Sequence, residues 1–237
     1  MLYLTLLICI VLIVMMDKLT QAFKLSSIWG LIGQICVSLV LIVVGKLEVS
    51  YINLGNHFEL GYLTIPFTLL VLVGFTNVMN IEKAQNTSIL LLPFVSLVYF
   101  SIAAYVMGHS FVLIIGFCTC LVILFIMLYG YFSSKVFVGR TIITSVGFII
   151  AVLSISFIKT SIVTIYIPLF TLALPFTLYY FITDKFTSIT SILVSTITAI
   201  FFGGLMFIVP FNIMWYFVVG LTIILVIMQS SRKYRII

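Results

Sequence analysis

Few side chains in this sequence have the chemistry to bind a polar ligand or react with it, because 64% of the 237 residues are hydrophobic and 7% are charged. Asn77 and Asn80 are among the candidates, and their spacing of three residues places both amides on one face of a helix. Two interpretations of this pair stay open. Either the amides cap the helix end and bond across a helix bundle, as small polar residues in membranes do, or they contact the headgroup of a ligand.

Basic residues near the ends of the hydrophobic stretches form a second group of candidates. Arg140 and Lys83 could bind a phosphate group directly, as basic pockets between membrane helices bind lipid headgroups. The alternative is that they only orient the protein in the membrane, which is the sole role we assign to Lys135. Both interpretations of Arg140 and Lys83 stay open at this point.

Three acidic residues also lie at expected helix ends, where their carboxylates could form a catalytic site. Each is followed directly by a lysine, so interfacial charge pairing is the simpler interpretation. The pairs are Asp17 with Lys18, Glu82 with Lys83, and Asp184 with Lys185.

Cysteine and histidine do not indicate a metal site. The four cysteines lie within hydrophobic stretches and are expected to be buried: Cys9, Cys36, Cys118 and Cys120. Cys118 and Cys120 are two residues apart, so they occupy different faces of a helix, without metal ligands nearby. His57 and His109 fall in expected outer loops and are interpreted as solvated.

Nine hydrophobic stretches must position these candidates, and most approach the ~20 residues that cross ~30 Å of hydrocarbon as a helix. They are Leu2 to Met16, Ser27 to Gly45, Leu63 to Val78, Thr87 to Met107, Phe111 to Tyr131, Thr141 to Ile158, Ser161 to Ile182, Ser188 to Val209 and Ile213 to Met228. Backbone groups in lipid must be satisfied within each segment, which favours helices. The sequence therefore predicts an all-α polytopic membrane protein of about nine transmembrane helices, forming a single integral membrane domain over residues 1–237. In the loop from Lys46 to Tyr62, two β-prone runs around a Leu-Gly-Asn turn predict a short extracytoplasmic hairpin.

The distribution of basic residues predicts the orientation of these helices. With a cytoplasmic C-terminus, nine basic residues lie on the cytoplasmic side and two outside, which fits the positive-inside rule. The cytoplasmic set is Lys18, Lys24, Lys83, Lys135, Arg140, Lys185, Arg232, Lys233 and Arg235, and the outer set is Lys46 and Lys159. This bias and the anionic inner leaflet explain the net charge of +6 without a nucleic-acid partner.

Several motifs resemble those of a known family. They are Gly33-Gln34, the hairpin-like loop, the segment from Gly61 to Ile81, and the segment from Val136 to Ser154. In order and spacing they are similar to the polyprenyl-phosphate N-acetylhexosamine-1-phosphate transferases. That family includes the enzymes that start wall teichoic acid and O-antigen synthesis and the phospho-MurNAc-pentapeptide translocase. The likeness runs from about Leu25 to Ser154 and is faint afterwards, where Leu174-Pro175 matches a family Val-Pro.

The resemblance implies the transfer of a sugar phosphate from a UDP-sugar to undecaprenyl phosphate at the cytoplasmic face, with Mg²⁺ held by carboxylates. The chain retains some residues of the family motifs: Asn77, Asn80, Gly139 and Thr141. Other residues occupy the positions of the family's carboxylates: Thr20, Gln21, Lys83, Asn86, Arg140 and Leu178. The family's basic arm with clustered histidines is replaced by Thr183 to Ser188, and the resemblance implies that the chain begins two spans into the family fold.

Loss of these carboxylates would turn a Mg²⁺ site into a cationic pocket without hard anionic ligands. We therefore expect a non-catalytic relative in a bacterial cell membrane, without a metal cofactor. Its expected partner is a polyprenyl phosphate or another anionic lipid, or else a membrane protein of envelope glycopolymer synthesis or a second copy of the chain. The alternatives are an active sugar-1-phosphate transferase with a divergent site that uses Mg²⁺, and a small transporter. Transport has the least support, because paired broken helices and intramembrane charges are not apparent in the sequence.

Overall fold

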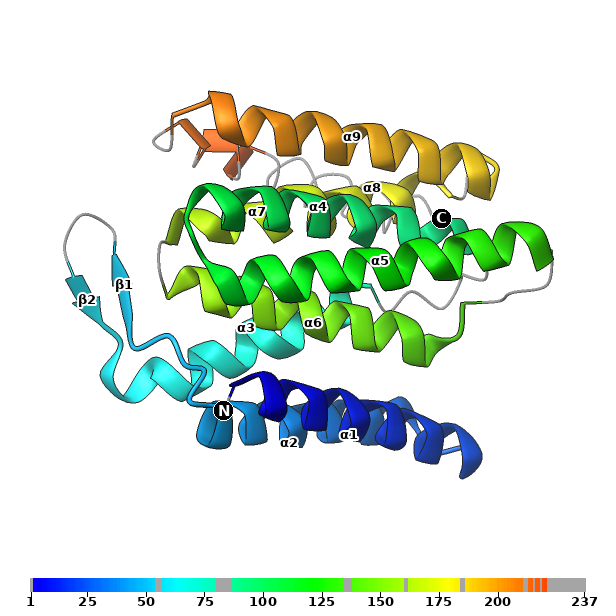
Figure 1. Ribbon diagram of the computed structural model, residues 1–237. Coiled ribbons are helices and arrows are strands. Elements are labelled where there is room, and N and C mark those ends of the chain that lie inside the picture. The colour runs from blue at the N-terminus through cyan, green and yellow to red at the C-terminus, as the bar shows by residue number, and fades with distance from the viewer. Residues whose placement is uncertain are drawn as a thin grey trace, which may run out of the picture.

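The computed structural model describes residues 2–53, 57–79, 87–133, 138–159, 162–183 and 186–210, with two-residue pieces at 213–214, 216–217 and 219–220. Its helices run alongside one another in a bundle, and a small β-hairpin projects from one end (Figure 1). Seven of the described helices are long and apolar enough to cross a membrane. The protein is therefore an all-α polytopic membrane protein, as the sequence predicts.

The seven long spans begin and end close to the predicted hydrophobic stretches. They are α1 (Leu2–Ala22), α2 (Ser27–Gly45), η1 with α3 (Gly61–Leu63 and Thr64–Val78), η2 with α4 (Thr87–Leu90 and Leu91–Val106), α5 (Ser110–Ser133), α6 (Arg140–Ile158) and α9 (Ser188–Ile208). A shorter apolar segment, Tyr166–Ile182, corresponds to the seventh predicted stretch. The ninth predicted stretch, from Ile213 to Met228, lies mostly outside the described residues.

The shorter segment is interrupted. After η3 (Ile162–Ile165) come α7 (Tyr166–Pro168), a π-helical turn η4 (Leu169–Ala173) and α8 (Leu174–Ile182). Pro168 and Pro175 bracket this turn, and a proline has no N–H for the carbonyl four residues earlier, which its ring also crowds. Thr171 in η4 donates a 2.8 Å hydrogen bond to Ser96 on α4, so a side-chain contact holds the irregular turn in the bundle.

The predicted hairpin is present. Strands β1 (Tyr51–Asn53) and β2 (His57–Glu59) pair antiparallel, with Tyr51 opposite Glu59. Two contacts join the hairpin region to the helices: the Val49 amide donates to the Thr68 hydroxyl (3.0 Å), and the Tyr51 hydroxyl donates to the carbonyl of Lys159 (3.4 Å). The hairpin therefore connects the start of α3 with the end of α6.

Helix α6 lies at the centre of the bundle. In this helix 83% of the span is buried, against 22–50% for the other six. Its closest neighbour is α3, where a Cβ added at Gly147 would lie 2.8 Å from the carbonyl oxygen of Thr76. Helix α1 packs against α6 as well, and α2 packs against both α1 and α3. Four helices, α1, α2, α3 and α6, therefore enclose one part of the interior.

The end of the bundle opposite the hairpin is called the Arg140 end below. There α1 and α3 end, and α2 and α6 begin (Figure 1). The polar residues selected from the sequence that the structure describes at this end are Asp17, Lys18, Thr20, Gln21, Asn77, Arg140 and Thr141. We expect this end to be cytoplasmic.

Two sequence-based expectations about burial are wrong in part. Cys36 and Cys118 are exposed on the outside of the bundle because their helix faces point outward, whereas Cys9 and Cys120 are buried. His109 is not a freely solvated loop residue, since its ring packs edge-on against Phe157 with the centroids 5.5 Å apart and its Nδ1 is buried. The side chain of His57 lies outside what the structure describes.

Candidate functional site at the Arg140 end

Polar side chains from four helices lie at the Arg140 end. Asp17 comes from α1, Gln34 from α2, Asn77 from α3, and Arg140 and Thr144 from α6. Ionisable groups inside a membrane protein are costly, and they commonly mark a functional site whose partners can be named. This four-helix cluster is therefore the candidate site.

Arg140 is the first residue of α6, directly after the N-cap Gly139. Gly139 is extended (φ −67°, ψ 155°) and has no side chain to cap the helix, so the first amides of α6 contribute positive potential at this end. The guanidinium reaches across to α2, where a Cβ added at Gly30 would lie 3.4 Å from Nη2. A glycine at position 30 thus leaves room for the arginine head.

Asp17 is the buried acid of the cluster, with only 4% of its surface exposed. Its carboxylate interacts with the Thr144 side chain through a hydrogen bond and with Arg140 through charge. The Thr144 hydroxyl also donates to the carbonyl oxygen of Arg140, one turn back on α6, at 3.0 Å, so the carboxylate and this carbonyl share its single proton. Within this cluster, two buried atoms have no hydrogen-bond partner among the described residues: Oδ2 of Asp17 and Nε of Arg140.

The interpretation of Asp17 as an interfacial charge paired with Lys18 is therefore wrong. Consecutive residues of a helix point in different directions, so Asp17 faces the bundle interior while Lys18 is exposed. The burial also explains why α1 continues to Ala22 instead of ending near Met16. The spacing of Cys9, Ile13 and Asp17, four residues apart, could have revealed that the acid shares the buried face.

Amide side chains make two further hydrogen bonds between helices at the Arg140 end. The Asn77 amide donates hydrogen bonds to Oε1 of Gln34 (2.7 Å) and to the carbonyl of Val73 (2.8 Å). The first of these joins α3 to α2, which is the cross-bundle bond that the structural interpretation of Asn77 describes. Between α1 and α6, the amide of Gln21 donates to the hydroxyl of Thr141 at 3.3 Å.

The remaining residues selected from the sequence are distributed more widely. Thr20 is buried on α1 and donates to the carbonyl of Met16 (2.8 Å), whereas Leu178 is half-buried on α8, a helix that does not contribute to the cluster. Several selected residues lie outside the described ranges: Asn80, Glu82, Lys83, Asn86, Lys135, Asp184 and Lys185.

A groove of about 690 Å³ runs along α1, α5 and α6 beside this cluster. Its polar end is formed by Lys18, Gln21, Gly139, Thr141 and Ser145, and the rest of its lining is largely aliphatic, from Ile10 and Val14 to Val122 and Ile149. On α1 the lining residues from Ile10 to Gln21 extend over about 17 Å at ~1.5 Å per residue. That is roughly half of a ~30 Å hydrocarbon core, so the groove has the depth of one leaflet.

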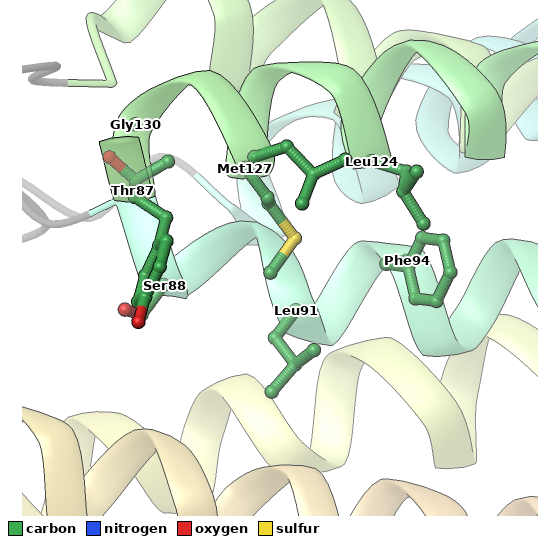
Figure 2. Close-up of a pocket in the computed structure, with 9 residues that line it drawn as sticks. Thr87, Ser88, Leu91, Phe94, Leu124, Met127 and Gly130 are labelled. Atoms are coloured by element: carbon green, nitrogen blue, oxygen red, sulfur yellow. The ribbon is translucent and has the colours of Figure 1, made fainter. Parts of the chain in front are cut away.

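A second pocket, of about 510 Å³, lies between the start of α4 and the end of α5 (Figure 2). Figure 2 shows Leu91 and Phe94 on one side and Leu124 and Met127 on the other, with Thr87 and Ser88 at one end. None of the described residues that line it is charged. The α1/α5/α6 groove, which contains Lys18, is therefore the better match for a lipid with an anionic headgroup.

The described residues of the cluster do not fit the Mg²⁺ site that the family resemblance implies. Mg²⁺ requires hard oxygen ligands, usually one or two carboxylates together with substrate phosphates. Here one carboxylate, Asp17, lies near a permanently charged guanidinium that repels a metal ion. The described residues contain no group of three or more His, Cys, Asp or Glu side chains that could hold a metal.

The fold and the cluster define a multi-pass membrane protein with a buried polar site at one end of its bundle. The family model of glycosyl transferase family 4 matches residues 1–158, and the chain belongs to this family. The chain is also similar to a protein of Bacillus subtilis (strain 168) named "Probable undecaprenyl-phosphate N-acetylglucosaminyl 1-phosphate transferase", with 25% identity over 168 residues. The aligned part is 69% of this chain and 47% of the Bacillus protein, so the chain spans about half the length of that relative.

Proposed function

We propose that this protein is a non-catalytic member of the family that binds a polyprenyl phosphate lipid at the Arg140 end. The observation that carries the proposal is the position of the Arg140 guanidinium. Its guanidinium is accommodated by Gly30 and interacts through charge with the buried Asp17 carboxylate. The family resemblance implies an acid at the position of Arg140. A guanidinium held in one orientation can meet two phosphate oxygens at once.

The charges of the site argue against sugar-phosphate transfer. The attack of a phosphate on the diphosphate of a nucleotide sugar requires neutralisation of both anionic groups, which metal ions provide in phosphoryl-transfer enzymes. The described cluster supplies one guanidinium and one opposing carboxylate, and it lacks the ligands to add a divalent cation. Such a site suits the binding of one phosphate better than a reaction between two phosphates.

The α1/α5/α6 groove supplies a place for the lipid chain. Its polar end contains Gly139 and Thr141, the residues on either side of Arg140, and Lys18 adds a second cation there. Aliphatic residues line the rest of the groove, whose full depth is about one leaflet. A lipid with its phosphate at the polar end and the first part of its chain along the groove matches both the charge and the hydrophobicity of this surface.

Purified protein provides the test. We expect native mass spectrometry to detect bound undecaprenyl phosphate, with the same occupancy in EDTA and in Mg²⁺. We expect no lipid-linked product with labelled UDP-N-acetylglucosamine, undecaprenyl phosphate and Mg²⁺. A metal-dependent lipid product would instead establish an active transferase, the activity for which the Bacillus relative is named.

A further inference from the structure

The two unpartnered atoms of the cluster have complementary hydrogen-bonding roles. Oδ2 of Asp17 can only accept while the carboxyl is ionised, and Nε of Arg140 can only donate. Buried polar atoms of this kind are uncommon, and each one that remains unpaired costs free energy. One ligand group satisfies both atoms if it has an acceptor oxygen for Arg140 and an O–H donor for Asp17.

A singly protonated phosphate monoester is a group of this kind. It has charged oxygens that accept from a guanidinium and one P–O–H that can donate to a carboxylate. Its second ionisation occurs near pH 6, so the protonated form is accessible close to neutral pH. A phosphodiester has the charged oxygens but no P–O–H, and it would bring an anion toward Asp17 without a proton between them.

We propose that Asp17 makes the Arg140 site selective for phosphate monoesters over phosphodiesters. Arg140 binds the charged oxygens, and Asp17 accepts the hydrogen bond from P–O–H. Thr144, fully buried and hydrogen-bonded to Asp17, orients the carboxylate. The inference rests on the proposed function, because it assigns a specificity determinant to the same lipid site.

The location of Asp17 allows this role. Gln21 lies one turn beyond Asp17 on α1, and Thr141 follows Arg140 on α6. Both line the polar end of the groove, where an exposed hydrogen bond of 3.3 Å joins them. For a phosphate at the end of the groove to reach the buried Asp17 and Arg140 atoms, which do not line it, this bond must open when the ligand binds.

Selectivity in this arrangement has two sources. The monoester gains a hydrogen bond to a charged acceptor, and the diester is repelled by a carboxylate that it cannot satisfy. A charged hydrogen bond of ordinary strength corresponds to a preference of about tenfold or more. Ordinary bilayer phospholipids such as phosphatidylglycerol are diesters, so this preference would keep the abundant lipids from occupying the site.

The test compares two probes with the same chain, undecaprenyl phosphate and its methyl phosphodiester, on the full-chain protein by competitive native mass spectrometry. We expect the wild type to prefer the monoester by about tenfold or more. Asp17→Asn, which keeps the shape of the side chain, should bring the preference close to one. Arg140→Gln should weaken the binding of both probes. The control is Thr20→Val, on the same buried face of α1, which should keep the wild-type preference.

A second variant guards against misfolding of Asp17→Asn. Thr144→Val keeps the carboxylate but removes its hydrogen bond, and it should lower the preference several-fold. If wild type and Asp17→Asn show the same preference while Arg140→Gln loses binding, the role of Asp17 is disproved and the lipid site stands. If the wild type binds neither probe, the proposed function itself fails.

Discussion

The side-chain amide of Asn77 on α3 donates a 2.7 Å hydrogen bond to Oε1 of Gln34 on α2. This bond joins two helices that flank the Arg140 site, and Gln34 is buried. Asn77→Leu would leave the Gln34 oxygen without this donor, so we expect a loss of about 1 kcal/mol in unfolding free energy. Thermal unfolding in detergent measures this loss. The double variant with Gln34→Leu should lose less unfolding free energy than the two single variants lose together. Strict additivity of the two losses would show that the two residues are not coupled.

The contact between α3 and α6 leaves no space for a side chain at position 147. Gly147→Ala would place a methyl group 2.8 Å from the Thr76 carbonyl oxygen, which forces the central helices apart. We expect a cost of about 1–3 kcal/mol in unfolding free energy. Gly74→Ala on α3 is the matched control, because no heavy atom lies within 4 Å of the added Cβ. An equal effect of the two substitutions would contradict the close approach of α3 and α6.

Substitutions of Arg140 test the phosphate contact. Arg140→Glu should reduce retention of polyprenyl phosphate about tenfold to a hundredfold, since the contact is worth roughly 1.5–3 kcal/mol. Arg140→Lys should reduce it less, because an ammonium keeps the charge but cannot bind two oxygens in parallel. Lipid copurification measures retention, with Lys135→Glu as the control. Equal retention in wild type, Arg140→Glu and Lys135→Glu would reduce Arg140 to a residue of membrane orientation.

The groove between α1, α5 and α6 can be filled without altering the charges of the site. Val122 lines the groove on α5, so Val122→Trp should obstruct the lipid chain and lower polyprenyl phosphate retention several-fold. Val44→Trp on the exposed surface of α2 introduces the same ring at a position that does not line the groove. Retention is measured alongside size-exclusion chromatography. Unchanged retention in Val122→Trp would show that the lipid chain does not lie in this groove. A change in oligomeric state without a change in retention would indicate that a second copy of the protein occupies the groove.

Reporter fusions test the predicted topology of nine helices with a cytoplasmic C-terminus. Fusions after Lys135 and at Ile237 should report a cytoplasmic location, and a fusion after Lys46 should report the opposite side. The last predicted helix, from Ile213 to Met228, determines the result at Ile237. An extracytoplasmic signal there would overturn either the number of helices or their direction.

The spans were predictable from the sequence because the membrane imposes the same length and composition on each of them. Helix α2 covers Ser27–Gly45, the predicted stretch, and α6 begins one residue before its predicted start at Thr141. The end of α1 was not predictable in this way. Asp17 has the polarity of an interfacial residue, and the groups that make its burial tolerable, Thr144 and Arg140, come from a helix far along the chain.

The sequence predicted several residues of the candidate site but not how they contact one another. The family resemblance selected Gln21, Asn77, Arg140 and Thr141, and the structure brings them to one end of the bundle. Their contacts join distant parts of the chain: Gln21 and Thr141 are 120 positions apart, and Gln34 and Asn77 are 43 apart. Without an arrangement of helices, the sequence could not show that Arg140 lies against Gly30 or that Asp17 faces it.

The central position of α6 also has a consequence for biogenesis. Most of the described elements that pack closely against it, α1, α3, α4 and α5, precede it in the chain, and the short η3 and α7 follow it. Chains are synthesised from the N-terminus, so these four helices leave the ribosome before α6 does. The most buried helix therefore inserts next to packing partners that have entered the membrane before it. Assembly of the Arg140 site can be complete once α6 has left the ribosome and entered the membrane, before α8 and α9 have joined the bundle.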